Sequence, residues 1–169
     1  MKSQFFGVKL GIILSLILAM PVYAQGGGKP IDVTVPMKTV VSNANTSRMM
    51  GTPRGRVLSS GEVELANDND GIFYVYGDTL CHSAVKDIYM TIYLEIWDEE
   101  LDDWGTLNMY EYEWHATTVE EDLHSAGVSF EIHNLQKGRE YRIRGTHSAN
   151  SFEDYFEIMS TETGAMTLN

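Results

Sequence analysis

The stretch DIYMTIYLEIWD at residues 87–98 constrains the fold more than any other part of the chain. Aliphatic residues alternate there with aromatic, polar or charged ones, which is the period of a strand with one buried face. One face would hold Ile88, Met90, Ile92, Leu94 and Ile96, and the other Tyr89, Thr91, Tyr93, Glu95 and Trp97. At about 3.3 Å per residue, this pattern predicts a long strand of roughly 35 Å or more.

A second aromatic strand, TLNMYEYEWHA, follows the acidic segment DEELDD at residues 98–103. Two such strands around a short polar turn predict a hairpin with an acidic tip. Shorter strands are predicted at 61–66, 71–76, 128–132, 140–146, 152–159 and 164–168, with one helical turn at 118–124. About eight short strands separated by turn residues are typical of antiparallel sandwiches and barrels. We therefore predict an all-β fold, an antiparallel β-sandwich of immunoglobulin-like size, over residues 56–169.

The first 24 residues have the features of a signal peptide. These are Lys2 and Lys9, an apolar run at 10–20, and the small residues Val22 and Ala24 before a cut at Gln25. The alternative is an uncleaved membrane anchor, but the apolar run covers only about half of a ~30 Å hydrocarbon core. The sequence predicts a secreted, extracellular protein with no membrane span after signal cleavage.

Residues 25–55 read as a flexible N-terminal tail, since they contain many glycines and prolines and little apolar periodicity. A short candidate strand lies at 31–35. The whole chain has a formal charge of −12, and loss of two lysines with residues 1–24 makes it −14. Such an acidic chain is a poor candidate for binding nucleic acid or anionic membranes.

The stretch REYRIRGTHSAN at residues 139–150 alternates in the same way as 87–98. Tyr141, Ile143, Gly145 and His147 would face the core, so Arg142 and Arg144 would face outward. These arginines are either a ligand-binding row or, as we favour, a solvated face with local ion pairs. Glutamates of EYEW or FEDYFE are the expected cross-strand partners.

Two acidic loops offer oxygen ligands of the kind that calcium prefers. The loop NDNDG at 67–71 resembles the start of a twelve-residue calcium-binding loop, whose sixth position is a glycine. With Gly71 at that position, Ala66 and Gly77 occupy the first and twelfth positions, where neither can supply a side-chain oxygen, so the motif fails. Turn formation accounts for that loop, since Asn, Asp and Gly tolerate positive φ. The DEELDD loop has no such reason to be acidic, so Asp98, Glu99, Asp102 and Asp103 are candidate ligands for a weak Ca²⁺ site; no other cofactor is expected.

No motif predicts catalysis. The five histidines have neither H-x-H nor H-E-x-x-H spacing, which disfavours zinc. The single cysteine, Cys81, cannot form an internal disulfide and is expected to be a small buried residue; an intermolecular bridge or a reactive thiol is the alternative. His82 adjoins it, and neighbours on a strand point to opposite faces, so the two cannot form a nucleophile–base pair. No carboxylate pair can be singled out, and an enzyme is not expected.

The aromatic residues of the hairpin are the main candidate binding surface. They are Tyr89, Tyr93 and Trp97 on the first strand, Trp104 after the tip, and Tyr110, Tyr112 and Trp114 on the second. The alternative is that the tail or a neighbouring strand covers them. We expect a secreted non-enzymatic binding or surface-interaction module for an unknown protein or carbohydrate. A calcium-stabilised structural domain is the alternative, and a small hydrolase with unidentified carboxylates is a weaker one.

Several segments together resemble a known family. They are PRG at 53–55 followed by SSGEVEL, YVYGDT at 74–79, VKDIYMTIYLE at 85–95, and YRIRGTHSAN at 141–150 followed by FE. About two thirds of the chain resembles a family of small secreted bacterial proteins, of Gram-positive clostridial type, known only as a domain of unknown function. The resemblance implies an exported β-sandwich with no established enzyme activity and no catalytic residues. In that family the hairpin tip is usually rich in glycine and serine, whereas this chain has DEELDD.

Overall fold

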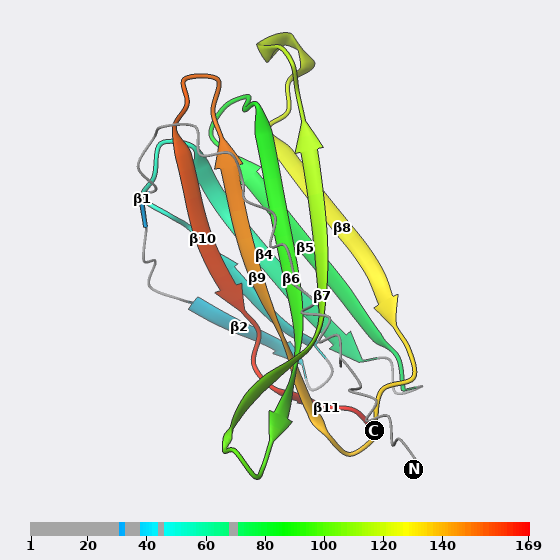
Figure 1. The fold of residues 1–169 in the computed structure, drawn as a ribbon. Coiled ribbons are helices and arrows are strands. Elements are labelled where there is room, and N and C mark those ends of the chain that lie inside the picture. Colours follow the sequence, from blue (N-terminus) through cyan, green and yellow to red (C-terminus); the bar gives the residue numbers. More distant parts are fainter. Residues whose placement is uncertain (1–30, 33–37, 44–45, 68–70) are drawn as a thin grey trace, which may run out of the picture.

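The computed structural model describes residues 31–32, 38–43, 46–67 and 71–169, and Figure 1 shows its fold. The predicted signal peptide at 1–24 lies outside the described residues. Within them, the chain forms eleven strands and one short 3-10 helix, Val119–Glu121. No helix in this described part is long and apolar enough to cross a membrane.

The strands form two sheets, called sheet A and sheet B below. Sheet A has the order β1 (Ile31–Asp32), β10 (Phe156–Glu162), β9 (Glu140–Asn150), β6 (Asp87–Asp98) and β7 (Asp103–His115), and β11 (Met166–Thr167) also pairs with β9. Sheet B has the order β2 (Lys38–Asn43), β3 (Thr46–Gly51), β4 (Leu58–Asn67), β5 (Phe73–Cys81) and β8 (Ser125–Ile132). Neighbouring strands run antiparallel, except that β1 is parallel to β10.

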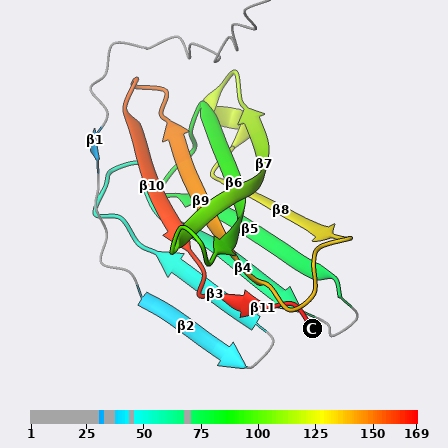
Figure 2. The same cartoon turned by 60° about the horizontal axis from the view of Figure 1, so that its bottom comes forward.

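The two sheets pack face to face, and Figure 2 shows them as two layers. The core between them is built from Val63, Leu65, Phe73, Val75 and Ile132 of sheet B and Met90, Ile92, Leu94, Tyr141 and Ile143 of sheet A. In β6, the four predicted core residues from Ile88 to Leu94 are buried, and Ile96 packs partly buried against them. The predicted all-β antiparallel sandwich is therefore confirmed, with β6 at its predicted bounds.

The N-terminal boundary differs from the expected one. Residues 25–55 were expected to form a flexible tail, yet β1, β2 and β3 all fall within that range. Met49 of β3 is fully buried, and Ser47 is almost so. The sequence TSRMMG has too few apolar residues to signal a strand alone. The segment becomes a strand because it pairs with β4. In that pairing, Ser47 lies opposite Leu65 and Met49 lies opposite Val63.

His147 of β9 links the two sheets. It is fully buried, with Nδ1 2.8 Å from Oγ1 of Thr79 in sheet B and Nε2 2.8 Å from Oγ1 of Thr161 in sheet A. Burial lowers the pKa of His147 to about 4. The residue beside the ring must be glycine, because a Cβ on Gly61 would lie only 2.7 Å from the imidazole ring. His147 is thus a neutral structural histidine.

Glu157 of β10 anchors the segment that enters β4. Its side chain is almost fully buried, and its carboxylate accepts hydrogen bonds from the backbone N–H groups of Arg56 (2.6 Å), Val57 (3.0 Å) and Leu58 (2.8 Å). Gly55 lies against the same carboxylate, so closely that a Cβ there would overlap it. One side chain therefore satisfies three consecutive backbone donors.

Candidate functional site

The tip of the β6–β7 hairpin presents two tryptophans on the outer face of sheet A. Trp97 lies directly opposite Trp104, with ring centroids 5.4 Å apart in an edge-to-face arrangement. The last residue of β6 that pairs with β9 is Ile96, so the tryptophan pair lies beyond the three-stranded part of the sheet. Figure 1 shows this end of the hairpin projecting past the body of the sandwich. The pair is the part of the hairpin best placed to meet a ligand.

Two arginines of β9 hold the aromatic side chains in place. Arg142 lies over the ring of Trp104 (4.4 Å to the centroid), and Arg144 lies over the ring of Tyr93 (4.0 Å). Such cation–π contacts contribute about 0.5–2 kcal/mol each. The arginines therefore belong to the same surface as the aromatics and fix the orientation of the rings.

Glu95 of β6 joins the two arginines. Its carboxylate is almost fully buried and binds Nε of Arg142 at 2.6 Å and Nε of Arg144 at 2.9 Å. Arg142 also pairs with Glu162 of β10 at 2.9 Å. The expected ion pairs are present, but the partners are Glu95 and Glu162, and not glutamates of EYEW or FEDYFE. We call the set Tyr93, Glu95, Trp97, Trp104, Arg142 and Arg144 the hairpin surface.

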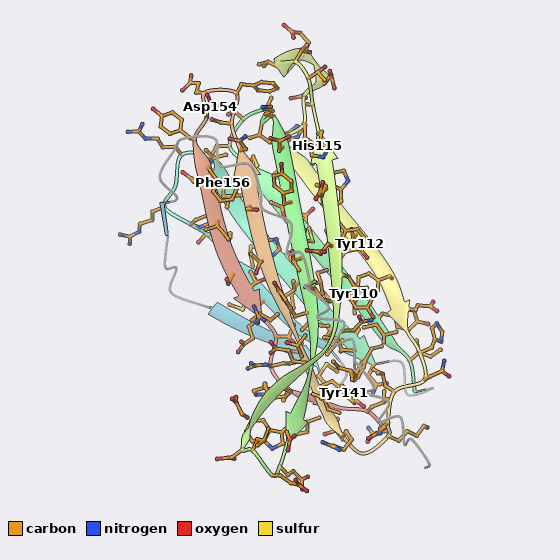
Figure 3. All side chains as sticks on the ribbon, viewed as in Figure 1. Tyr110, Tyr112, His115, Tyr141, Asp154 and Phe156 are labelled. Carbon is orange, nitrogen blue, oxygen red and sulfur yellow. The ribbon has the colours of Figure 1, made fainter. Side chains whose placement is uncertain are left out.

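The aromatic candidates divide between the two faces of sheet A. Tyr110, Tyr112 and Trp114 lie directly opposite Ile92, Met90 and Ile88, and directly opposite residues share a face. They are partly buried against the core, where the ring of Tyr110 contacts that of Phe130 of β8 at a tilt, with centroids 4.6 Å apart. Figure 3 labels Tyr110 and Tyr112 on β7. Tyr110, Tyr112 and Trp114 therefore face sheet B, whereas Tyr89, Tyr93, Trp97 and Trp104 lie on the outer face.

A β-bulge causes this division. Leu94 pairs with Asn108 while Glu95 pairs with Thr106, which leaves Leu107 as an extra residue in β7. One extra residue exchanges the two faces of a strand. Trp104 consequently faces outward, whereas Tyr110, an even number of residues later, faces inward.

At the other end of the outer face, Tyr89 lies beside a polar cluster. The ring of Tyr89 meets His115 edge to face at 5.9 Å, and Nδ1 of His115 lies 2.8 Å from Oδ1 of the buried Asp87. The hydrogen bond to Asp87 raises the pKa of His115. Asn150 donates a second hydrogen bond to Asp87 at 3.1 Å. This cluster ties β6, β7 and β9 together.

The acidic tip uses its carboxylates as turn caps. Oδ1 of Asp98 accepts hydrogen bonds from the backbone N–H groups of Glu100 (2.9 Å) and Leu101 (3.2 Å). Oδ1 of Asp103 accepts one from Trp104 (2.7 Å), and Asp102 has a positive φ of 52°. Across the described residues, no three His, Cys, Asp or Glu side chains gather where they could hold a metal ion. Asp98 and Asp103, two of the four candidate calcium ligands, therefore act as turn caps.

Calcium is accordingly expected to leave the melting temperature of the EDTA-treated protein unchanged. A ligand at 100 times its dissociation constant would add about 2.7 kcal/mol, which shifts the midpoint by several degrees. Thermal melts in EDTA and in millimolar calcium measure this. If calcium raises the melting temperature, and this rise disappears in the double variant Asp102→Asn, Asp103→Asn, the prediction is wrong and the tip binds calcium.

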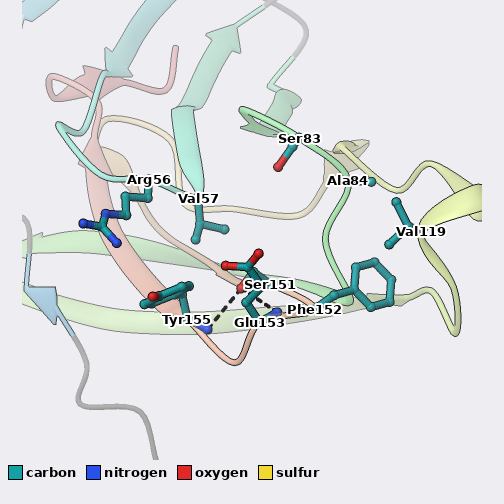
Figure 4. Close-up of a pocket in the computed structure, with 9 residues that line it drawn as sticks. All are labelled: Arg56, Val57, Ser83, Ala84, Val119, Ser151, Phe152, Glu153 and Tyr155. Atoms are coloured by element: carbon teal, nitrogen blue, oxygen red, sulfur yellow. Dashed lines mark hydrogen bonds between the residues drawn. The ribbon is translucent and has the colours of Figure 1, made fainter.

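A shallow pocket lies at the opposite end of the sandwich, where three loops and the 3-10 helix meet (Figure 4). Its volume is about 310 Å³, and it is lined by Arg56, Val57, Ser83, Ala84, Val119, Ser151, Phe152, Glu153 and Tyr155. Arg56 lies over the ring of Tyr155 at 5.7 Å. No local sequence pattern indicates this pocket, because its lining comes from loops far apart in the chain.

Cys81 is a free, buried cysteine, as expected. Burial, with a smaller contribution from the negative charge of Glu157, raises the pKa of its thiol to about 12. Since the thiolate is the reactive form, this position disfavours the reactive-thiol alternative. Its neighbour His82 is exposed, so the structure does not bring the two together as a catalytic pair.

The fold and the hairpin surface define an all-β protein, a sandwich of two antiparallel sheets with an aromatic and arginine-rich outer face. A family model described as a family of unknown function (DUF6147) matches residues 32–166. The chain belongs to this family. No curated protein matches the chain, and no solved structure matches it.

Proposed function

We propose that this protein is a secreted, non-enzymatic binding module whose contact region is the hairpin surface. One observation supports this above the others. Arg142 and Arg144, which share one buried carboxylate, lie over the rings of Trp104 and Tyr93 on the outer sheet face, and Trp97 packs edge to face against Trp104. Rings that are ordered before binding lose little conformational entropy when a ligand arrives. The pattern in residues 1–24 supports export, and the family resemblance supports a Gram-positive, clostridial-type bacterial source.

The ligand is a carbohydrate or a protein surface, and carbohydrate is the first to test. Aromatic rings pack against the apolar face of a sugar ring, while neighbouring arginine side chains donate hydrogen bonds to its hydroxyls. Arg144 keeps about a third of its side chain exposed, so it can still donate hydrogen bonds to a ligand. Neither the calcium-stabilised alternative nor the hydrolase alternative is favoured by a specific observation in the described residues.

Removing the tryptophan pair is expected to abolish binding. The protein would be applied to a glycan array, and hits would be measured by isothermal titration calorimetry. In Trp97→Ala and in Trp104→Ala we expect an affinity loss of about thirtyfold or more, which is the size of a contact hot spot. Thermal melts would confirm that both variants remain folded.

The matched control is Tyr76→Ala, because Tyr76 is also an exposed aromatic residue but lies on β5 of sheet B. It should keep full affinity. Failure of every glycan to bind, or binding that survives loss of both tryptophans, would contradict the assignment of the hairpin surface as a carbohydrate site.

A further inference from the structure

Strand β7 is the edge of sheet A and, among the described residues, pairs with a strand on one side only. In an antiparallel sheet, every second residue of an edge strand points its N–H and C=O groups away from the sheet. After the bulge at Leu107, β7 runs regularly from Asn108 to His115. The N–H of Met109 already donates to Oδ1 of Asn108 at 2.9 Å, so the open row begins after it and, at 3.4 Å per residue, is about 20 Å long, enough to pair with about six residues of another chain.

The outward side chains of this edge are acidic. Glu111 and Glu113 are both exposed on the outer face, and Met109 precedes them with 47% of its surface exposed. In the described part of the chain, Glu111 has no ion pair with a lysine, arginine or histidine, and Glu113 pairs with the imidazole of His115, at 3.4 Å. Unneutralised charges along an edge determine which strands can pair with it, because like charges directly opposite are destabilising.

A second copy of this chain is a poor occupant of the edge. Two antiparallel copies of β7 are related by a two-fold axis. If that axis passes between residues 111 and 113, Glu111 lies opposite Glu113 of the other copy. If the two-fold axis of the pair instead passes through Glu111 or Glu113, that glutamate lies opposite the same glutamate of the other copy. Two negative charges then face each other at the middle of the new pair. The charge pattern therefore disfavours self-pairing and favours a strand of opposite charge.

We propose that the β7 edge is an interaction surface for an extended basic segment of a partner protein, which adds to sheet A as a further strand. Side chains two residues apart lie on the same face of a strand, so lysines or arginines at alternate positions would meet Glu111 and Glu113 together. The formal charge of −12 on the whole chain attracts such a segment over longer distances. This inference concerns the backbone edge and stands whether or not the hairpin surface binds a ligand.

The test uses four synthetic octapeptides, all acetylated and amidated. The first has lysine at every second position, with threonine or valine between the lysines. The second has glutamate in place of lysine. The third has the lysine sequence with N-methyl groups on alternate amides, on the hydrogen-bonding side, which removes backbone donors and keeps the charge. The fourth has the same residues in scrambled order. Binding is measured by calorimetry, and the contact site by chemical-shift changes of the β7 backbone amides in NMR spectra.

The lysine peptide should bind and shift the amides of residues 108–115, while the glutamate, N-methyl and scrambled peptides should not. The double variant Glu111→Lys, Glu113→Lys should lose about tenfold or more in affinity, which corresponds to about 1.4 kcal/mol. The control double variant Glu120→Lys, Glu121→Lys makes the same charge change at exposed residues of the 3-10 helix, and it should lose less than about twofold once long-range charge is screened at 0.15 M salt.

Three results would overturn the proposal. Equal binding of the N-methyl peptide would show that only charge attraction is involved. An equal loss of affinity in the Glu120, Glu121 variant would show that the site is not β7. Absence of binding by the lysine peptide at millimolar concentration, in a protein whose melt is normal, would show that the edge does not accept a basic strand.

Discussion

Replacing Glu157 by alanine is expected to lower the free energy of unfolding by about 3–5 kcal/mol, because three consecutive backbone donors, two of them buried, lose a charged acceptor. The carboxylate of Glu157 accepts hydrogen bonds from three consecutive N–H groups at the start of β4, at 2.6–3.0 Å. Val57 and Leu58, which donate two of these hydrogen bonds, belong to a buried apolar cluster that also contains Met159. The loss therefore combines unsatisfied donors with a cavity.

Urea unfolding followed by circular dichroism measures the effect, and two further variants separate its causes. Glu157→Gln keeps the volume but leaves a neutral oxygen and turns an NH₂ group toward backbone donors, so an intermediate loss of about 2–3 kcal/mol is expected. Glu153→Ala removes an exposed glutamate from the neighbouring loop and should change stability by no more than about 0.5 kcal/mol. A loss below about 1 kcal/mol in Glu157→Ala would show that the segment is held by other contacts.

The parts of the fold that could be predicted from the sequence are those with a strong local period. The segment 87–98 alternates without interruption, and its inner residues from Ile88 to Leu94 are buried as predicted. The outward direction of Arg142 and Arg144 follows from the same alternation in β9. Their partner could not be predicted, because Glu95 lies opposite Arg142 only through the β6–β9 register, and no local pattern sets that register.

The candidate site was predictable only in part, for two physical reasons. A single extra residue, Leu107, exchanges the faces of β7, and alternation alone gives no sign of a bulge. The other reason is distance along the chain. Glu157 is 100 residues from Val57, whose backbone it binds, and β3 becomes a strand because β4 pairs with it. Both contacts depend on the assembled sandwich.

Lowering the pH from 7 to below 4 is expected to remove about 3 kcal/mol of stability through His147 alone. The pKa of His147 is about 4 in the folded protein, against about 6.5 for an unperturbed histidine. The unfolded chain therefore binds more protons than the folded chain between these two values. The contribution of His147 is fully present above pH 6.5, declines as the pH falls, and is lost completely below 4. The cost arises because a charged imidazole between two sheets has no water to solvate it.

Other groups act in the opposite direction, so the effect of His147 must be measured as a difference. The hydrogen bond to Asp87 raises the pKa of His115. His115 therefore stabilises the folded protein below pH 6.5, and this contribution is lost as the pH rises. Burial raises the pKa of Asp78, with a further contribution from Glu62, which also favours the folded protein at low pH. The total profile between pH 4 and 7 therefore contains opposing slopes.

The variant His147→Gln isolates the effect, because an amide can both donate to and accept from Thr79 and Thr161 without titrating. It should be less stable than the natural chain at pH 7, since the smaller side chain leaves a gap beside Gly61. Its stability should depend less steeply on pH between 4 and 6.5, and the two curves should converge as the pH falls. Urea unfolding at half-unit intervals measures both curves. Parallel curves through this range would show that His147 takes up its proton without cost, and that the link between Thr79 and Thr161 is open to water.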